Sequence, residues 1–328
     1  CALRLSGLEV HSLWFDEGHT TFLASLPQGE LLQQLHGDRH PPLSFLAFHA
    51  WSALFGNSDV ALRMLPALLS CISLGLFAWL SSKWLEPGAK TCAVGLYSFA
   101  PFHLAHATEV RMYAFVEVGA LLALCGTAQF LIGRRRRGAL LVVVGQGIAL
   151  GSHYFGGLLL ATIASIAVAA VLMRRLELRA SFALVGSALL GVAAWIPWMA
   201  SALSDQMNAT WGFSARISVR DVVELPLRMV FTEMSAVPDA LRGLAVAASV
   251  LLLAGFALHL LQTWRSFEAT RLWILLAFAA PVASALALAL VGPPNFTPRY
   301  LTVAAPGAAL MIASGLASSP WRAPRRIA

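Results

Sequence analysis

The sequence contains little charge for its length. Only 12% of its 328 residues are charged, whereas an ordinary soluble domain carries about 25%. Hydrophobic residues make up 58% of the chain, and the mean hydropathy is +0.72. This composition excludes an ordinary soluble globular domain and predicts an integral membrane protein.

Cysteine is also scarce, and the four cysteines form neither a CxxC motif nor a metal-binding spacing. Cys71, Cys92 and Cys125 lie inside apolar runs, where a free cysteine behaves as a small hydrophobic residue. Cys1 opens the stretch CALRLSGL, which reads like the end of an apolar helix. We therefore expect residues 1–8 to be the tail of a truncated first transmembrane helix. A lipid-modified Cys1 is the alternative, although a chain with many spans needs no such anchor.

The chain shows no clear internal repeat and no alternation typical of a barrel, so its long apolar runs predict helices. A span of the bilayer core needs about 20 apolar residues. Nine runs come near that length: 60–80, 91–107, 112–132, 138–152, 155–173, 180–200, 241–263, 272–291 and 300–318. The sequence predicts an all-α, polytopic transmembrane helix bundle.

Basic residues concentrate in every second loop between these runs. The loops are 81–90, 133–137, 174–179, 264–271 and 319–328. They hold 14 of the 23 lysines and arginines, including the block Arg134 to Arg137, but only three acidic residues: Glu86, Glu177 and Glu268. By the positive-inside rule these loops are cytoplasmic, and the basic excess is no sign of nucleic-acid binding.

The first outer segment, residues 9–59, is more than a simple loop. Residues 18–35 and 41–56 are partly apolar but interrupted by polar groups, so we expect two helices along the outer membrane surface. The predicted organisation is this extracytoplasmic loop, a bundle of about nine transmembrane helices over 60–318, and a basic cytoplasmic tail at 319–328.

The outer side also carries the stretch WFDEGHTT, in which two adjacent acids follow two aromatic residues. Neighbouring residues at a helix start point in different directions, so Asp16 and Glu17 should have different roles. One carboxylate could accept a proton from a hydroxyl, while the other orients it or holds a cation. The alternative is a solvated helix N-terminus with favourable acids in its first turn.

A second outer cluster is ATEVRMYAFVE, residues 107–117. Glu109, Tyr113 and Glu117 recur every four residues and so share one helix face. Glu117 lies inside a predicted span, where an ionisable group is costly and indicates function. Arg111 at the outer mouth suits a phosphate group, although an interfacial anchor is the alternative.

Three further outer positions carry polar or aromatic side chains. His40 precedes Pro41-Pro42 and could donate to a phosphate, bind a metal or act as a plain cap. The pairs His153-Tyr154 and Arg299-Tyr300 stand at the outer ends of spans, where aromatic residues also serve as interfacial anchors. Together, the outer clusters predict an anionic ligand that meets a hydroxyl group, and the apolar helices offer a groove for a lipid tail.

The order of W-F-D-E, H-P-P-L, E-x-R-M-Y and P-R-Y-L resembles the GT-C polytopic membrane glycosyltransferases. The chain is most similar to bacterial members related to protein O-mannosyltransferases and to the aminoarabinose transferase. The resemblance covers residues 9–318. It implies an inverting glycosyltransferase that moves a sugar from a polyprenyl-phosphate donor to an acceptor hydroxyl outside the membrane.

The resemblance also implies roles for individual residues. Asp16, Glu17 and Glu109 fall at catalytic acidic positions, and His40, Arg111 and Arg299 at donor phosphate-binding positions. Tyr113, His153, Tyr154 and Tyr300 are expected in the substrate pocket. Asp16 and Glu109 could hold a divalent cation such as Mg²⁺ or Mn²⁺, or the arginines could neutralise the phosphate instead.

The expected partners are the lipid-linked sugar donor, an acceptor hydroxyl on a lipid, glycan or protein, and membrane lipids. The expected location is a bacterial inner membrane, with the active site facing outside. A transporter or flippase for a lipid-linked or anionic solute is the alternative, but its polar groups should gather near the bilayer midplane.

Overall fold

The computed structural model describes residues 1–9, 12–208, 228, 242–291 and 298–317, and every regular element in these parts is a helix. The helices are α1 (Ala2–Leu5), α2 (Phe15–Ser25), α3 (Gln28–His36), α4 (Leu43–Phe55), α5 (Asp59–Trp84), α6 (Pro87–Phe99), α7 (Pro101–Ala107), α8 (Tyr113–Leu131), α9 (Arg135–Ser152), η1 (Tyr154–Gly157), α10 (Leu158–Leu172), α11 (Leu178–Ala193), α12 (Ile196–Asn208), α14 (Arg242–Ser266), α15 (Ala269–Val291), η4 (Pro298–Ala304) and α16 (Ala305–Ala317). The all-helical prediction is confirmed.

The segment before the bundle folds into three short helices, α2, α3 and α4. The expected helix over 41–56 is confirmed as α4, Leu43–Phe55. The expectation of one helix over 18–35 is wrong, because α2 ends at Ser25 and α3 begins at Gln28. Leu26 has an extended backbone, as a residue before proline prefers, and Pro27 precedes the first turn of α3.

The described part of each of the nine predicted runs is mainly helical, and two of the runs divide into separate α-helices. The run 91–107 divides into α6 and α7, because Pro101 begins a new helix after the extended Ala100. The run 180–200 divides into α11 and the start of α12, which are bent by 43°. The predicted basic tail, 319–328, lies outside the described residues.

Six helices in the described parts are long and apolar enough to cross a membrane, or seven if the bent pair counts as one span. The other two predicted spans miss the criterion for physical reasons. Helix α9 begins with three arginines at positions 135–137, and α6 and α7 are each short. Both nevertheless pack within the bundle, α9 against α8 and α11, and α6 against α5 and α16.

Helix α8 forms the centre of the bundle. Nearly all of its side chains are buried, and it packs against α5, α9 and η4. Its hydropathy alone would suit a lipid-exposed helix, so burial on all sides shows that its neighbours replace lipid around it. Because Tyr113 is its first residue, α8 carries the predicted outer cluster directly into the core.

Close glycine contacts hold α8 and α9 together as an antiparallel pair. A Cβ atom at Gly145 would lie 2.5 Å from both the Ala123 nitrogen and the Gly119 oxygen, and one at Gly138 would lie 2.6 Å from the Gly126 oxygen. Small residues permit such backbone approach in membrane proteins, where close packing replaces the hydrophobic effect between helices.

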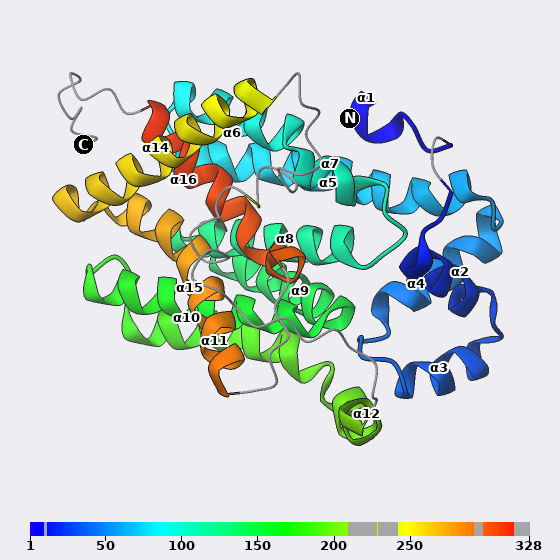
Figure 1. Cartoon of the computed structure of the whole chain (residues 1–328). Coiled ribbons are helices and arrows are strands. Elements are labelled where there is room, and N and C mark those ends of the chain that lie inside the picture. Colours follow the sequence, from blue (N-terminus) through cyan, green and yellow to red (C-terminus); the bar gives the residue numbers. More distant parts are fainter. Residues whose placement is uncertain (10–11, 209–227, 229–241, 292–297, 318–328) are drawn as a thin grey trace.

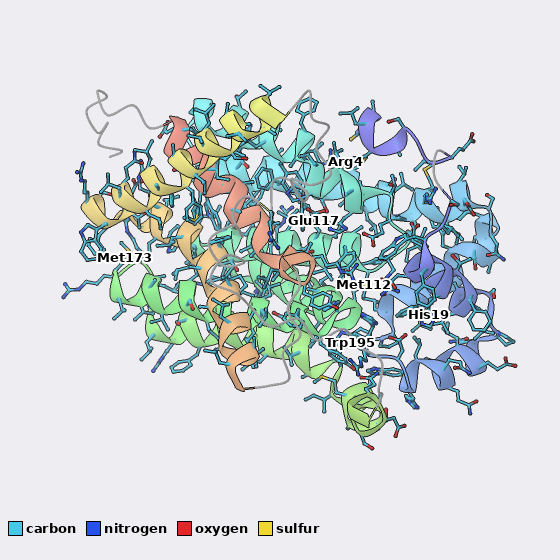
Figure 2. All side chains as sticks on the ribbon, viewed as in Figure 1. Arg4, His19, Met112, Glu117, Met173 and Trp195 are labelled. Atoms are coloured by element: carbon cyan, nitrogen blue, oxygen red, sulfur yellow. The ribbon has the colours of Figure 1, made fainter. Side chains whose placement is uncertain are left out.

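The bundle has two distinct ends. Figure 1 shows α2, α3 and α4 together at one end, whereas the turn between α10 and α11 lies at the other. The labelled side chains in Figure 2 mark this separation, with His19 at the first end and Met173 at the second. Arg174 and Arg175 follow Met173 directly, so this basic loop lies opposite the acid pair, as the charge pattern predicts.

A glycine replacement tests the α8–α9 contact. We expect Gly145→Ala to destabilise the protein by about 1–3 kcal/mol, because the new methyl group would clash with backbone atoms of α8. The matched control is Gly186→Ala in α11, where no atom lies within 4 Å of the new Cβ. The control should be neutral or stabilising, by up to about 1 kcal/mol. Thermal unfolding of purified protein in detergent measures both, and equal unfolding temperatures for the two variants would contradict the packing.

Candidate active site

The Glu17 carboxylate joins three separate segments at the end of the bundle that carries α2, α3 and α4. One oxygen accepts hydrogen bonds from the Trp14 nitrogen at 3.2 Å and the Arg63 guanidinium at 3.4 Å. The other oxygen accepts from the Val110 nitrogen at 2.9 Å. Glu17 is buried, and both of its oxygens are bound by the protein. Its predicted catalytic role stays a prediction, but this geometry favours holding the site together.

The Asp16 carboxylate points elsewhere, as expected for neighbouring residues at a helix start. Its Oδ2 lies 3.8 Å from the Arg299 guanidinium, and its side chain is 27% exposed. Its backbone oxygen accepts a hydrogen bond from Arg111 Nη1 at 3.2 Å. Residues 16, 111 and 299 are therefore brought together from α2, the segment before α8, and η4.

Arg299 lies among aromatic rings. Its guanidinium carbon is 5.8 Å from the ring centre of Trp14, 6.0 Å from that of Tyr113 and 5.9 Å from that of Tyr300. Such contacts stabilise a cation by about 0.5–1 kcal/mol at exposed sites and more where water is excluded. They hold the guanidinium in place without using all of its N–H donors, since its Nε is buried without a partner in the described structure.

Arg111 supplies a second cation beside the first. The side chain is buried, and Nη1 also donates to the Thr20 hydroxyl at 3.0 Å. Within the described parts its Nε has no hydrogen-bond partner. A buried donor without a partner costs about 1–3 kcal/mol. Two guanidinium groups with spare donors therefore make this end of the bundle suited to an anion with several oxygens.

Glu109 is bound more tightly to a neighbour than Asp16 is. Its Oε2 lies 2.5 Å from His106 Nδ1 in the preceding helix, and His106 in turn contacts the Tyr113 ring at 4.7 Å. Glu109 and Asp16 both act electrostatically on Arg299. Both predicted acidic positions thus belong to one cluster, with Asp16 the less constrained of the two.

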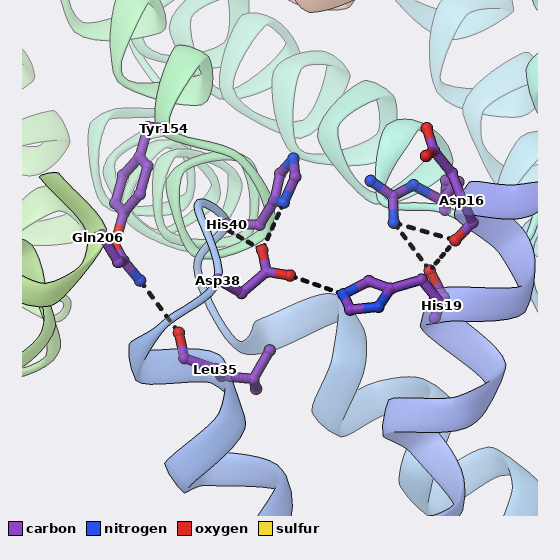
Figure 3. A network of polar contacts seen from close by, with 9 residues as sticks. Asp16, His19, Leu35, Asp38, His40, Tyr154 and Gln206 are labelled. Carbon is purple, nitrogen blue, oxygen red and sulfur yellow. Dashed lines mark hydrogen bonds and ion pairs between the residues drawn. The ribbon is translucent and has the colours of Figure 1, made fainter. Parts of the chain in front are cut away.

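His40 belongs to a bridged trio of side chains at the start of α4 (Figure 3). The Asp38 carboxylate bonds His40 Nδ1 at 2.7 Å and His19 Nε2 at 2.9 Å. Asp38 also accepts from the backbone nitrogen of His40 at 2.9 Å. Burial alone would raise the pKa of Asp38, but the hydrogen bonds from the two histidines outweigh it and hold that pKa well below its usual range.

The imidazole of His153 contacts His40 on one side and Tyr300 on the other. The ring centres are 5.5 Å and 5.0 Å away, respectively. Burial lowers the pKa of His153 well below its ordinary value, and the charges of His40, Arg111 and Arg299 lower it further. At neutral pH His153 is therefore uncharged and cannot add to the positive charge of the two arginines.

Tyr154 is the predicted pocket residue that makes its contacts elsewhere. Its hydroxyl lies 2.5 Å from the Gln206 side-chain oxygen, and Gln206 donates to the Leu35 oxygen at 3.2 Å (Figure 3). Tyr154 thereby links η1 to α12, and Gln206 links α12 to α3. These contacts favour a structural role at the rim over direct contact with the arginines.

Four residues of the cluster were not among the predicted site residues: Trp14, His19, Asp38 and His106. Trp14 and His19 flank the acid pair in the sequence, and Asp38 stands two residues before His40. Closeness in the sequence to a predicted site residue was therefore the only sign that could have indicated these three residues. These residue types are common at membrane interfaces, and only the contacts assign them to the site. Trp14 and His19 also line an open apolar hollow of about 390 Å³ beside α2.

The described side chains give little support to the alternative that Asp16 and Glu109 bind a divalent cation. The described residues contain no group of three or more histidine, cysteine, aspartate or glutamate side chains placed to hold a metal ion. Asp16 faces Arg299, and Glu109 faces His106. This donor set does not fit a divalent cation, so we derive no step through one.

Comparison with known proteins identifies the family region and the fold. The dolichyl-phosphate-mannose-protein mannosyltransferase family matches residues 39–200. No curated protein matches the sequence significantly. Among solved structures, ArnT from Cupriavidus metallidurans in the apo state superimposes with a TM-score of 0.67 at 13% identity, covering 97% of this chain and 58% of ArnT. The same protein bound to undecaprenyl phosphate gives 0.64 at 15% identity, covering 97% and 59%.

These matches agree with the all-helical arrangement of the described residues. The chain spans somewhat less than three fifths of the length of the ArnT structures that it matches. It is an integral membrane protein of the GT-C fold, similar to ArnT, and its residues 39–200 are the part that matches the dolichyl-phosphate-mannose-protein mannosyltransferase family.

Proposed function

We propose that the protein is an inverting membrane glycosyltransferase that moves a sugar from a polyprenyl-phosphate donor to an acceptor hydroxyl. The observation that carries this proposal is the contact of Asp16 with Arg299, with Arg111 beside it, at one end of a GT-C helix bundle. This arrangement offers a base and two phosphate-binding cations in one place.

The donor phosphate would bind between Arg111 and Arg299, whose spare N–H groups supply charge-assisted hydrogen bonds. Its polyprenyl tail would lie along the apolar helices. Binding of the phosphate at Arg299 would compete with Asp16 for the guanidinium and so leave the Asp16 carboxylate available to a hydroxyl. Undecaprenyl phosphate is the ligand in one of the similar ArnT structures, which supports a lipid of this kind here.

In the transfer step the acceptor oxygen attacks the anomeric carbon and its proton passes to Asp16. The bond from that carbon to the phosphate oxygen breaks, and the polyprenyl phosphate leaves with both electrons. Arg111 and Arg299 stabilise the charge that develops on the leaving phosphate. Because the acceptor and the leaving group lie on opposite sides of the carbon, the configuration inverts.

The remaining residues hold this arrangement. His40 lies within electrostatic range of Arg111 and Asp16, so it borders the phosphate site, and Asp38 fixes its ring. Tyr113 and Tyr300 orient Arg299. The sugar is not specified by these contacts. The transporter alternative requires a polar site near the midplane, whereas these residues cluster at one end.

The first test concerns the orientation of the bundle, for which we propose that Asp16 and Arg299 face outside and Arg134 to Arg137 face the cytoplasm. In a variant without its native cysteines, single cysteines replace the exposed residues Asp205 and Arg135. A membrane-impermeant maleimide should label position 205 in intact bacterial cells and position 135 only after permeabilisation. Labelling of position 135 in intact cells would reverse the assignment.

The second test separates the base from the phosphate-binding arginine. Asp16→Asn keeps size and hydrogen bonding but removes the base, so single-turnover transfer should fall by about 10²–10⁴-fold. Binding of undecaprenyl phosphate should stay near normal in this variant. Arg299→Ala should weaken both binding and rate, because the arginine meets the phosphate before and during transfer.

The measurements use undecaprenyl-phosphate-linked mannose and aminoarabinose as donors. Asp59→Asn is the matched control, since this exposed aspartate begins α5 away from the site and should leave both quantities unchanged. An Asp16→Asn variant that retains more than about half of the wild-type rate would rule Asp16 out as the base.

A further inference from the structure

A buried pair of a carboxylate and a histidine lies one helical turn below the site, and the proposed transfer does not use it. The Glu117 carboxylate in α8 is 2.5 Å from His103 Nδ1 in α7, and the two side chains are 4% and 1% exposed. Removing one member of a buried pair leaves the other without compensation. A pair of this kind inside a membrane bundle therefore fixes the position of the two helices that carry it.

Neighbouring groups surround this pair on its inner side. The Tyr97 ring stacks on His103 with centres 3.9 Å apart, and the Tyr97 side chain interacts with Glu117. Arg4 donates to the Tyr97 backbone oxygen at 3.0 Å and to the Ser70 hydroxyl at 2.8 Å. Its charge also acts on Glu117. The pair thus sits where α1, α5, α6, α7 and α8 meet.

A second contact between α7 and α8 lies one turn closer to the site. His106 lies three residues after His103, so these two share one face of α7. Tyr113 lies four residues before Glu117, so these two share one face of α8. His106 contacts both Glu109 and Tyr113. Helices α7 and α8 are therefore joined by two side-chain contacts, His103 with Glu117 and His106 with Tyr113. The five residues 108–112 connect the end of α7 to the start of α8.

We propose that Glu117 and His103 are positioning residues that set the place of segment 108–112 in the active site. The inference rests on the proposed function, because it assigns the pair a role in transfer. The segment carries Arg111, which contacts the Asp16 backbone, and Val110, whose nitrogen binds Glu17. A shift of α7 against α8 would therefore displace Arg111 relative to Asp16 and Arg299.

A double-mutant cycle on the transfer rate distinguishes positioning from a contribution to stability alone. Glu117→Gln keeps the side-chain size and removes its charge. Because a displacement of about 1 Å can cost up to 10²-fold in rate, we expect Glu117→Gln to lower single-turnover transfer about 10-fold. In an Arg111→Lys background the same change should cost less than about 2-fold, because the displaced group is already altered.

The control is Thr127→Val, a change of similar size at a buried position of the same helix. It should leave the rate of the folded protein unchanged in both backgrounds. Equal losses for Glu117→Gln with and without Arg111→Lys would overturn the proposal. So would a Glu117→Gln variant that unfolds at lower temperature but transfers at the wild-type rate.

Hydrogen exchange provides a readout that does not depend on transfer. Glu117→Gln should speed amide exchange at least about 10-fold in residues 108–112, because the segment loses its fixed ends. Exchange in α9 should not change, and Thr127→Val should leave both segments as in the wild type. Unchanged exchange in 108–112 would overturn the positioning role. Failure of the wild-type protein to transfer any sugar would refute the proposed function but not this result.

Discussion

The end of the bundle that carries α2, α3 and α4 depends on the buried carboxylate of Glu17. It binds the backbone at the start of α2, Arg63 of α5 and the backbone just before α8. The last two partners lie 46 and 93 residues from Glu17 in the sequence. Removing one partner of a buried charged pair typically costs about 3–5 kcal/mol. Because Asp16 is its neighbour and Arg111 follows Val110, the same carboxylate determines where Asp16 and Arg111 lie.

The acidic side chains of Glu17 and Glu109 have closer charged or polar partners than the two arginines of the site have. Glu17 is compensated by Arg63, and Glu109 contacts His106, so both acids have close partners. Among the described residues, the Arg299 guanidinium has a 3.8 Å contact with Asp16 and three aromatic rings around it. Arg299 and Arg111 therefore keep donors for an incoming anion. In the proposed function, a phosphate would compete with Asp16 for Arg299 without the loss of a fully buried pair.

The interior of the bundle supports this arrangement through close packing. Glycines let α8 and α9 approach until their backbones touch, and the pair Glu117–His103 joins α8 to α7. Neither feature requires the hydrophobic effect, which is weak between helices in lipid. A central helix with fixed neighbours gives the candidate site at its N-terminal end a rigid support, and an active site needs that rigidity to hold reacting groups in place.

The sequence by itself determined the helical membrane class, the approximate position of nine helical runs and the end at which the chemistry gathers. Hydropathy and the placement of arginines are local properties, so a single chain reveals them. It also singled out Asp16, Glu109, Arg111 and Arg299, because charge is rare in such a chain. It did not reveal that α2 ends before Pro27, nor that Asp38 holds His40. The different environments of Asp16 and Glu17 follow from contacts with residues far away in the sequence. Only the tertiary structure decided these points, because such contacts leave no periodic pattern along the chain.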